Sequence, residues 1–408
     1  MNRTETPSIR FCGFSNTWEQ HKLGEFSEKV IEKNFQDLLS ETFTNSAEYG
    51  VISQRDFFDH DISNAENICG YYIVRDDDFV YNPRISVTAP CGPINRNKLG
   101  RNGVMSPLYT VFRTHGVDAE YLEWFFKTYY WHNFMYFNGD SGTRSDRFSI
   151  KNDLFFQMPI SIPSIEEQQK IGSALTKLEN LITLHQRKYE KLKNLKASML
   201  EKMFPKDGTD VPEVRFKGFM RPWQTISLKD IASEITRTDK TSQAPIMMIT
   251  AANGFIDQSD RYSFDNAGQS LAKYIVLKKD ELAYNHGASK LRPYGSCFAL
   301  EVDEARIPYV YHCFAISDYN PYFVSRVLNN KTTEKQLRRL VTSGARMDGL
   351  LNISYEEYTT MKIQLPEKEE QDQISEYFKN IENLIILCQQ ELDKLQSLKK
   401  ALLEKMFV

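Results

Sequence analysis

The chain has 408 residues with 51 basic and 54 acidic side chains, 12% aromatic residues and a mean hydropathy of −0.49. This length predicts two or three domains of about 100–200 residues each, and the many Phe, Tyr, Leu and Ile residues exclude a largely disordered chain. A net charge of −3 excludes a uniformly basic nucleic-acid coat, although a local basic surface remains possible because binding depends on where the charge lies.

The sequence also argues against membrane and secreted classes of protein. No segment approaches the roughly 18 consecutive apolar residues of a membrane span, and the first residues lack the apolar core of a secretory signal. The six cysteines are widely spaced and form no CxxC pair, which argues against a zinc site and against a disulfide framework. We therefore expect a cytoplasmic protein without structural metal.

The dominant feature of the chain is an internal repeat, which has to be found before the fold is assigned. Residues 163–204 and 366–407 align without a gap and share 20 of 42 positions. Shorter motifs recur at offsets of 202 to 205 residues, and the sequences between them diverge. These motifs are Arg10-Phe11 with Arg215-Phe216, Gly13-Phe14 with Gly218-Phe219, Trp18 with Trp223, Tyr81-Asn82 with Tyr284-Asn285, and Ser141-Gly142-Thr143-Arg144 with Ser343-Gly344-Ala345-Arg346.

In chain order, the repeat predicts four segments: 1–162, 163–204, 205–365 and 366–408. The first and third segments carry short apolar runs separated by Gly, Pro, Asn and Asp clusters, a pattern typical of strands and turns. A helical stretch at 118–126 interrupts the first of them. The fold class is therefore α+β, with two similar α/β bodies separated by two long helices and related by pseudo-twofold symmetry.

The second and fourth segments predict these long helices. Ser164 and Glu167 form a capping-box pattern, whereas the second copy has Glu367 at the cap. A helix of about 39 residues is roughly 58 Å long, and its single apolar stripe needs a partner stripe. We expect the two copies to pair as an antiparallel coiled coil. The predicted interface comprises Leu178, Leu181, Ile182, Leu192, Leu195, Met199, Ile381, Leu384, Ile385, Leu395, Leu398 and Leu402.

Extra apolar residues widen these stripes beyond a two-helix seam, which leaves surface for a helix from another protein. They are Leu181, Leu184, Leu384, Ile386 and Leu387.

Sequence motifs for catalysis are missing. The chain has no Gly-Lys dipeptide for a phosphate-binding loop and no GxGxxG after a strand. The segment Asn320-Pro321-Tyr322 lacks the second proline of an amino-methyltransferase motif. Its Asn-Pro pair predicts a turn instead. His286, Ser289 and Lys290 lie close in sequence but without an orienting acid. We therefore predict that the chain is not an enzyme and has no catalytic or metal site.

Basic residues among Asn, Gln, Ser and Tyr indicate where DNA could bind, since these residue types contact phosphates and base edges. The first body has a net charge of −5 and the second +2, so the basic surface must be local. The two Ser-Gly-x-Arg motifs predict either DNA-facing loops or structural turns, and the Tyr-Asn pairs favour a fold role over DNA contact. The candidate residues are Arg84, Arg96, Lys98, Arg101, Ser141, Arg144, Lys290, Arg292, Arg338, Arg339, Ser343 and Arg346.

These repeated motifs together give the chain a resemblance to the specificity subunits of type I restriction–modification systems. The resemblance rests on the Phe-x-Gly-Phe…Trp entry, the Ser-Gly-x-Arg loop, the Glu-Glu-Gln helix start and the Leu-Glu-Lys-Met-Phe helix end. Each motif occurs twice and in the same order, and together they cover essentially the whole chain.

The resemblance implies two target recognition domains, each reading one half of an asymmetric, bipartite double-stranded DNA target. It implies that the two helices set the spacer and dock two methyltransferase subunits, and that restriction–translocase subunits join this core. The subunit itself would be non-catalytic, with S-adenosylmethionine, Mg and ATP held by its partners. Two alternatives remain: a coiled-coil scaffold that joins two protein-binding modules without reading DNA, and a single-chain enzyme with an unrecognised site.

Overall fold

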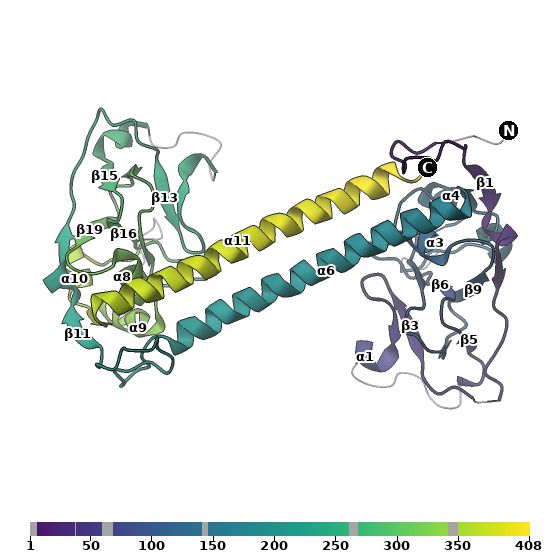
Figure 1. Cartoon of the computed structure of the whole chain (residues 1–408), viewed down its shortest axis with the longest axis horizontal. Helices are drawn as coiled ribbons and strands as arrows, with labels where there is room; N and C mark the ends of the chain where they lie inside the picture. The colour runs from purple at the N-terminus through teal and green to yellow at the C-terminus, as the bar shows by residue number, and fades with distance from the viewer. Residues whose placement is uncertain (1–5, 37, 59–67, 141–145, 261–267, 342–349) are drawn as a thin grey trace. The chain divides into compact units, whose positions relative to one another are not determined.

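The computed structural model describes residues 6–36, 38–58, 68–140, 146–260, 268–341 and 350–408 (Figure 1). These residues form two compact units: residues 1–187 with 389–408, and residues 188–388. The division passes through both long helices, so the first unit combines two distant parts of the chain. No helix among the described residues is long and apolar enough to cross a membrane.

The first unit consists of a body of short strands and helices, followed by the first part of a long helix. Its elements are β1 (Glu19–Lys22), η1 (Leu23–Glu25), β2 (Ser27–Lys29), β3 (Phe43–Ser46), β4 (Gly50–Ser53), α1 (Gln54–Phe58), β5 (Tyr72–Val74), β6 (Phe79–Tyr81), β7 (Ile94–Arg96), β8 (Gly103–Met105), β9 (Thr110–Thr114), α3 (Ala119–Phe125), α4 (His132–Asn138), α5 (Asn152–Phe155), β10 (Pro159–Ile162) and α6 (Ile165–Lys202), which continues into the second unit.

The second unit repeats this sequence of elements after a short linker. Its elements are β11 (Gln224–Ser227), α7 (Leu228–Ile231), β12 (Ala232–Glu234), β13 (Met247–Thr250), β14 (Gly254–Asp257), η2 (Gln258–Asp260), η3 (Gly268–Lys273), β15 (Ile275–Lys278), β16 (Leu282–Asn285), β17 (Ser296–Ala299), β18 (Glu304–Ile307), β19 (His312–Ile316), α8 (Pro321–Leu328), α9 (Lys331–Leu340), α10 (Tyr355–Thr359), β20 (Lys362–Leu365) and α11 (Lys368–Lys405), which continues into the first unit.

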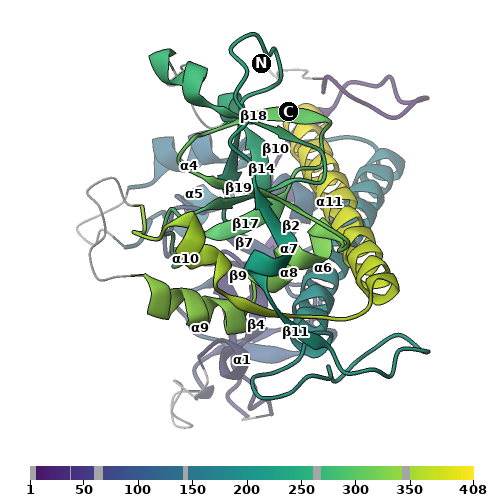
Figure 2. The same ribbon diagram turned by 90° about the vertical axis from the view of Figure 1, so that its left-hand side faces the viewer.

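The sheets of the two units have the same strand order, which confirms the internal repeat predicted from the sequence. The first unit has a four-stranded sheet β2-β9-β6-β7 and the pairs β1-β10, β3-β4 and β5-β8, and the second has β12-β19-β16-β17 with β11-β20, β13-β14 and β15-β18. All the pairings between these strands are antiparallel. Figure 2 faces the second unit, where α9 and α10 lie next to one another.

The central strands β6 and β16 show why the sequence folds this way. Each is hydrogen-bonded on both sides, and all of its residues are buried except Asn285, as expected for a strand covered on both faces. The turns before them place Asp77 and Asp280 at φ 67° and 70°, a left-handed conformation that Asp tolerates better than most residues. This backbone requirement explains why Asp recurs at these two positions.

Buried ion pairs attach each long helix to its own body. Arg10 contacts Glu167 through two hydrogen bonds of 2.9 and 2.6 Å, and Arg215 contacts Glu370 through two of 2.9 and 2.5 Å. The two glutamates are 1% and 0% exposed. Since both Glu167 oxygens accept from Arg10, only the Ser164 side of the expected capping box forms, with Ser164 Oγ accepting from the Glu167 N–H at 3.4 Å.

The glutamine that follows the glutamate in both copies of the repeat joins the helix start to the neighbouring loop. Gln168 donates to the Pro163 carbonyl at 2.8 Å and accepts from the Asp118 N–H at 2.8 Å. Gln371 makes the same two contacts with Pro366 and Asn320, at 2.8 and 3.0 Å. The repeated Glu-Glu-Gln motif is therefore a structural junction in both copies.

The long helices pair in opposite directions within each unit, as the sequence predicts. In the first unit, Lys399 of α11 contacts Glu179 of α6 at 2.6 Å; in the second unit, Lys196 of α6 contacts Glu382 of α11 at 2.8 Å. The repeat offset of 203 residues relates Lys196 to Lys399 and Glu179 to Glu382. The two ion pairs are therefore equivalent under the pseudo-twofold symmetry, and this relation requires antiparallel helices.

Glu382 makes the helix pairing in the second unit sensitive to acid. Burial acts to raise the pKa of Glu382, but hydrogen bonds and positive charge from Arg326 and Lys196 outweigh it and lower the pKa. Glu382 therefore stabilises the fold above its unfolded pKa of about 4.3, and this contribution is lost as the pH falls through the folded pKa. We expect Glu382→Gln to lower the urea midpoint at pH 7, and the gap to the wild type to shrink below about pH 4.

The control for this prediction is Glu376→Gln, an exposed position on the same helix. It should leave the urea midpoint close to that of the wild type between pH 3 and 7. A gap for Glu382→Gln that is independent of pH would contradict the assigned role.

Candidate nucleic-acid interface

In each unit, a Tyr-Asn pair anchors the loop that follows the central strand. Tyr81 donates its hydroxyl to the Cys91 carbonyl at 2.9 Å, and Tyr284 donates to the Tyr294 carbonyl at 2.6 Å. Burial raises the pKa of both tyrosines, so both remain protonated donors at neutral pH. This geometry explains why Tyr recurs at the end of the strand.

The asparagines complete the same anchor. Asn82 donates to the Asn45 carbonyl at 2.8 Å, and Asn285 donates to the Ile249 carbonyl at 3.0 Å. Each side-chain oxygen also accepts from a backbone N–H two residues further on, at 3.0 and 2.9 Å. The loops 82–93 and 286–295 are therefore held in the same way although their sequences differ.

Two glycines close these loops and give a testable prediction. Gly92 and Gly295 have φ of 82° and 80°, and a Cβ atom would lie 2.1 Å from the Asn82 carbonyl oxygen and 2.5 Å from that of Asn285. We expect Gly92→Ala and Gly295→Ala to destabilise the fold by more than the ~1–2 kcal/mol typical of left-handed backbone, because the clash adds to it. Thermal unfolding measures this.

Gly116→Ala serves as the control, because Gly116 has φ 67° but open space around its Cβ position. It should show only the cost of the backbone conformation. Equal losses for all three variants would show that the loop closures are not tightly packed.

The two Ser-Gly-x-Arg motifs cannot be placed on this frame, but their flanking residues can. Ser141, Arg144, Ser343 and Arg346 lie outside the described residues, but the segments directly after them are described. Ile85 donates its N–H to the Asp146 carbonyl at 3.1 Å, and Leu351 donates its N–H to the His286 carbonyl at 2.9 Å. In both units, the segment after the motif therefore contacts the anchored loop.

A helix completes each of these surfaces. In the first unit, the Tyr136 ring of α4 packs edge-on against Phe148, with ring centroids 6.1 Å apart. In the second, the Arg292 guanidinium donates to the Asn329 carbonyl just before α9, and burial lowers the pKa of Arg292. We call these two surfaces the first and second loop–helix surfaces: residues 82–93, α4 and 146–148; and residues 286–295, α9 and 350–351.

The structure separates the basic residues predicted for the first body. Arg84 is exposed on the first loop–helix surface, 3.8 Å from Asp146. Arg96 pairs with Phe79, at the opposite end of the β6–β7 hairpin from the loop. Its guanidinium contacts Asp77 and Glu123, both at 2.9 Å. The Arg96 guanidinium thus forms ion pairs with two carboxylates in this structure.

Lys98 and Arg101 follow Arg96 and also have acidic partners. Lys98 contacts Glu123 at 3.1 Å, and Arg101 contacts Glu41 at 2.7 Å. DNA contact by these residues stays a prediction, and it would have to compete with these ion pairs.

Four of the basic residues predicted for the second body belong to the second loop–helix surface. Lys290 is exposed on the loop, and Arg338 and Arg339 are exposed in the last turn of α9. Arg292 is half-buried and fixes the loop to the residue before α9. The sequence predicted one local concentration of basic residues in this body, and DNA contact by these residues stays a prediction.

Two aromatic residues on α4 were missed in the sequence. Tyr136 and Phe137 are 53% and 89% exposed on the first loop–helix surface. The offset of 202 residues that aligns Ser141 with Ser343 also aligns these two residues with Arg338 and Arg339. This alignment could have indicated that Tyr136 and Phe137 are candidate site residues. Their side chains differ so much from arginine that the sequence alone did not suggest an equivalent role.

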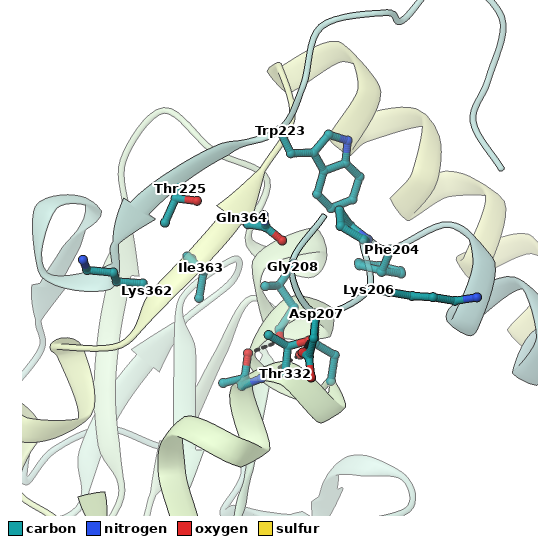
Figure 3. A pocket seen from close by; sticks show the side chains of 14 residues that line it. Phe204, Lys206, Asp207, Gly208, Trp223, Thr225, Thr332, Lys362, Ile363 and Gln364 are labelled. Atoms are coloured by element: carbon teal, nitrogen blue, oxygen red, sulfur yellow. Dashed lines mark hydrogen bonds between the residues drawn. The ribbon is translucent and has the colours of Figure 1, made fainter. Parts of the chain in front are cut away.

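A cavity of about 220 Å³ lies in the second unit (Figure 3). It lies beside the linker, where Asp207 contacts Lys335 and accepts from Thr332 Oγ1 at 3.0 Å. The amine groups of Lys206 and Lys362 point away from one another (Figure 3). The lining residues thus fasten the linker to α9 and form no nucleophile–base arrangement.

The residues predicted to form the helix interface are only partly buried. Ile381 is 5% exposed, whereas Leu181, Leu195, Leu384 and Leu398 are between 39% and 48% exposed. The remaining members are half-buried: Leu178, Ile182, Leu192, Met199, Ile385, Leu395 and Leu402. Leu184, Ile386 and Leu387 are more than half exposed, so both helices retain apolar surface in this structure.

Comparison with known proteins identifies the class of this fold. Residues 15–194 match the family described as the type I restriction modification DNA specificity domain. This match covers the first body and much of the first long helix, and the second unit has the same strand order as the first.

Individual relatives agree with this assignment. The chain is 23% identical over 287 residues to the type I restriction enzyme MjaVIII specificity subunit of Methanocaldococcus jannaschii, a match that spans 62% of each protein. Its fold is similar to the crystal structure of the type I restriction–modification S subunit from M. genitalium, with a TM-score of 0.58, 12% identity and 99% of each chain covered. The chain is thus similar in sequence to one specificity subunit and similar in fold to another.

Proposed function

We propose that this chain is the non-catalytic DNA-specificity subunit of a type I restriction–modification complex, and that each unit reads one half of a bipartite target. The observation that carries this proposal is the pair of loop–helix surfaces. Both are built on the same anchored loop, but they present different side chains. A shared frame with different contact residues is what two unlike half-sites require, so the target is asymmetric.

The exposed side chains on these surfaces suit DNA. Arginine and lysine contact phosphates and set the position of the duplex, while contacts to base edges select the sequence. Lys290, Arg338 and Arg339 supply positive charge in the second unit, and Arg84 does so in the first. Since the chain as a whole has a net charge of −3, partner subunits supply much of the remaining electrostatic affinity.

The long helices suit a second task of such a subunit, which is to hold the two units apart and to bind partner subunits. Their antiparallel pairing gives both units an equivalent helix end, and exposed leucines remain on both helices. We propose that the helices set the spacer between half-sites and dock two methyltransferase subunits, to which the restriction–translocase subunits add. S-adenosylmethionine, Mg and ATP are then bound by these partners, and the methyltransferase flips out the target adenine.

Selection from a random duplex library by the reconstituted complex tests this function. We expect enrichment of one bipartite sequence and an affinity that falls steeply with salt, while the purified chain alone methylates and cleaves nothing. Assembly of the complex without sequence enrichment would favour a coiled-coil scaffold instead. Methylation or cleavage by the purified chain would show a catalytic site in it.

A further inference from the structure

The two loop–helix surfaces present different side chains at two pairs of equivalent helix positions. α4 and α9 both precede a Ser-Gly-x-Arg motif, and both turn an apolar residue inward at the same position: Met135 is 0% and Leu337 is 3% exposed. The next two residues are exposed in each helix. They are Tyr136 and Phe137 in α4, and Arg338 and Arg339 in α9.

The two aromatic residues on α4 have different surroundings, which indicates different roles. The Tyr136 ring lies 6.1 Å from that of Phe148, so it packs against the 146–148 segment of the surface. Phe137 is 89% exposed. A single exposed Phe is unremarkable by itself, but this one occupies the position at which the sister surface presents Arg339.

The chemistry of the two pairs points to different features of a DNA duplex. Arginines contact phosphates, or the O6 and N7 atoms of guanine. A phenyl ring can do neither, but it can pack against the 5-methyl group of thymine, the one apolar feature of the major groove. Burying a methyl group between the ring and the base stabilises the complex without adding charge.

We infer that Phe137 is a specificity-determining residue that recognises a thymine methyl group in the half-site read by the first unit, while Arg338 and Arg339 hold the other half-site through phosphate or guanine. This inference rests on the proposed function and deepens it. It assigns apolar selection to the first surface and charge-dependent binding to the second.

The test uses the reconstituted complex and the target selected from the random library. Each thymine of the two half-sites is replaced in turn by deoxyuridine, which removes only the 5-methyl group. We expect one replacement to weaken wild-type binding about fourfold, the value of one buried methyl-sized group. Phe137→Ala should weaken binding to the thymine duplex and lose its sensitivity to that replacement.

Two controls separate this role from a structural one. Phe35→Ala changes an aromatic residue of the first unit that is 74% exposed and should retain the full thymine preference. Arg338→Ala and Arg339→Ala should also retain it, but each should reduce the slope of log affinity against log salt by about one. Thermal unfolding of Phe137→Ala should match the wild type because the ring is exposed.

Failure of this inference can be told apart from failure of the proposed function. A wild-type complex that selects no sequence overturns the proposed function. A complex that selects a target without thymine in either half-site overturns only the role of Phe137. Unchanged thymine sensitivity in Phe137→Ala does the same.

Discussion

Glu370→Gln should destabilise the second unit by about 3–5 kcal/mol, the usual effect of removing one member of a buried ion pair. Glu370 is 0% exposed and accepts both hydrogen bonds of Arg215, at 2.9 and 2.5 Å. The substitution keeps the shape of the side chain but leaves the arginine charge in a site where its own side chain is only 10% exposed. Urea unfolding measures the loss, and hydrogen exchange locates it.

The internal repeat offers a matched test of the same contact. Glu167→Gln breaks the equivalent pair with Arg10 and should have a similar effect on the first unit. Glu301→Gln is the control, because its contact with Lys379 is 3.7 Å long and both side chains are exposed. Exposed pairs contribute about 0–1 kcal/mol, so a control loss as large as that of Glu370→Gln would refute the assigned role.

Phe407→Ala should destabilise the first unit by about 3–5 kcal/mol, as expected for truncation of a buried phenylalanine. Phe407 follows the end of α11 and is 1% exposed in the core of the first body. Its ring centroid lies 5.4 Å from that of Tyr121 and 6.3 Å from that of Phe125. The substitution leaves a cavity in this core, which thermal unfolding detects.

Phe204→Ala makes the equivalent change in the second unit. Phe204 lies 5.5 Å from Phe323 and 5.8 Å from Trp223, measured between ring centroids, and we expect a loss of the same size. Phe137→Ala removes an exposed ring and should leave stability unchanged. A small effect of Phe407→Ala would mean that α11 is not fastened to the first body through this residue.

The repeat made much of the fold predictable from the sequence. It indicated two equivalent α+β bodies and two paired helices, and the structure shows the same strand order twice. The motifs at the repeat positions also proved structural: Arg10 and Arg215 bind buried glutamates of the long helices. Sequence alone could not reveal these pairs because their members lie more than 150 residues apart.

The candidate interface was less predictable for a physical reason. Basic residue types were expected to mark DNA contact, but Arg96 and Arg101 have carboxylate partners, which only three-dimensional proximity reveals. Phe137 was overlooked because an aromatic residue in a helix usually belongs to the core. Its exposure on α4 depends on which face of this short helix packs inward, and that is decided by Met135.

Lengthening both long helices tests the central claim most directly. Seven residues inserted after Arg187 in α6 and seven after Cys388 in α11 keep the heptad pattern and add about 10 Å, or roughly three base pairs at ~3.4 Å each. The same insertion in the linker at Gly208 is the control. Methylome sequencing of strains that carry each variant should show unchanged half-sites with a longer spacer for the helix variant alone, whereas altered half-sites with an unchanged spacer would contradict the account.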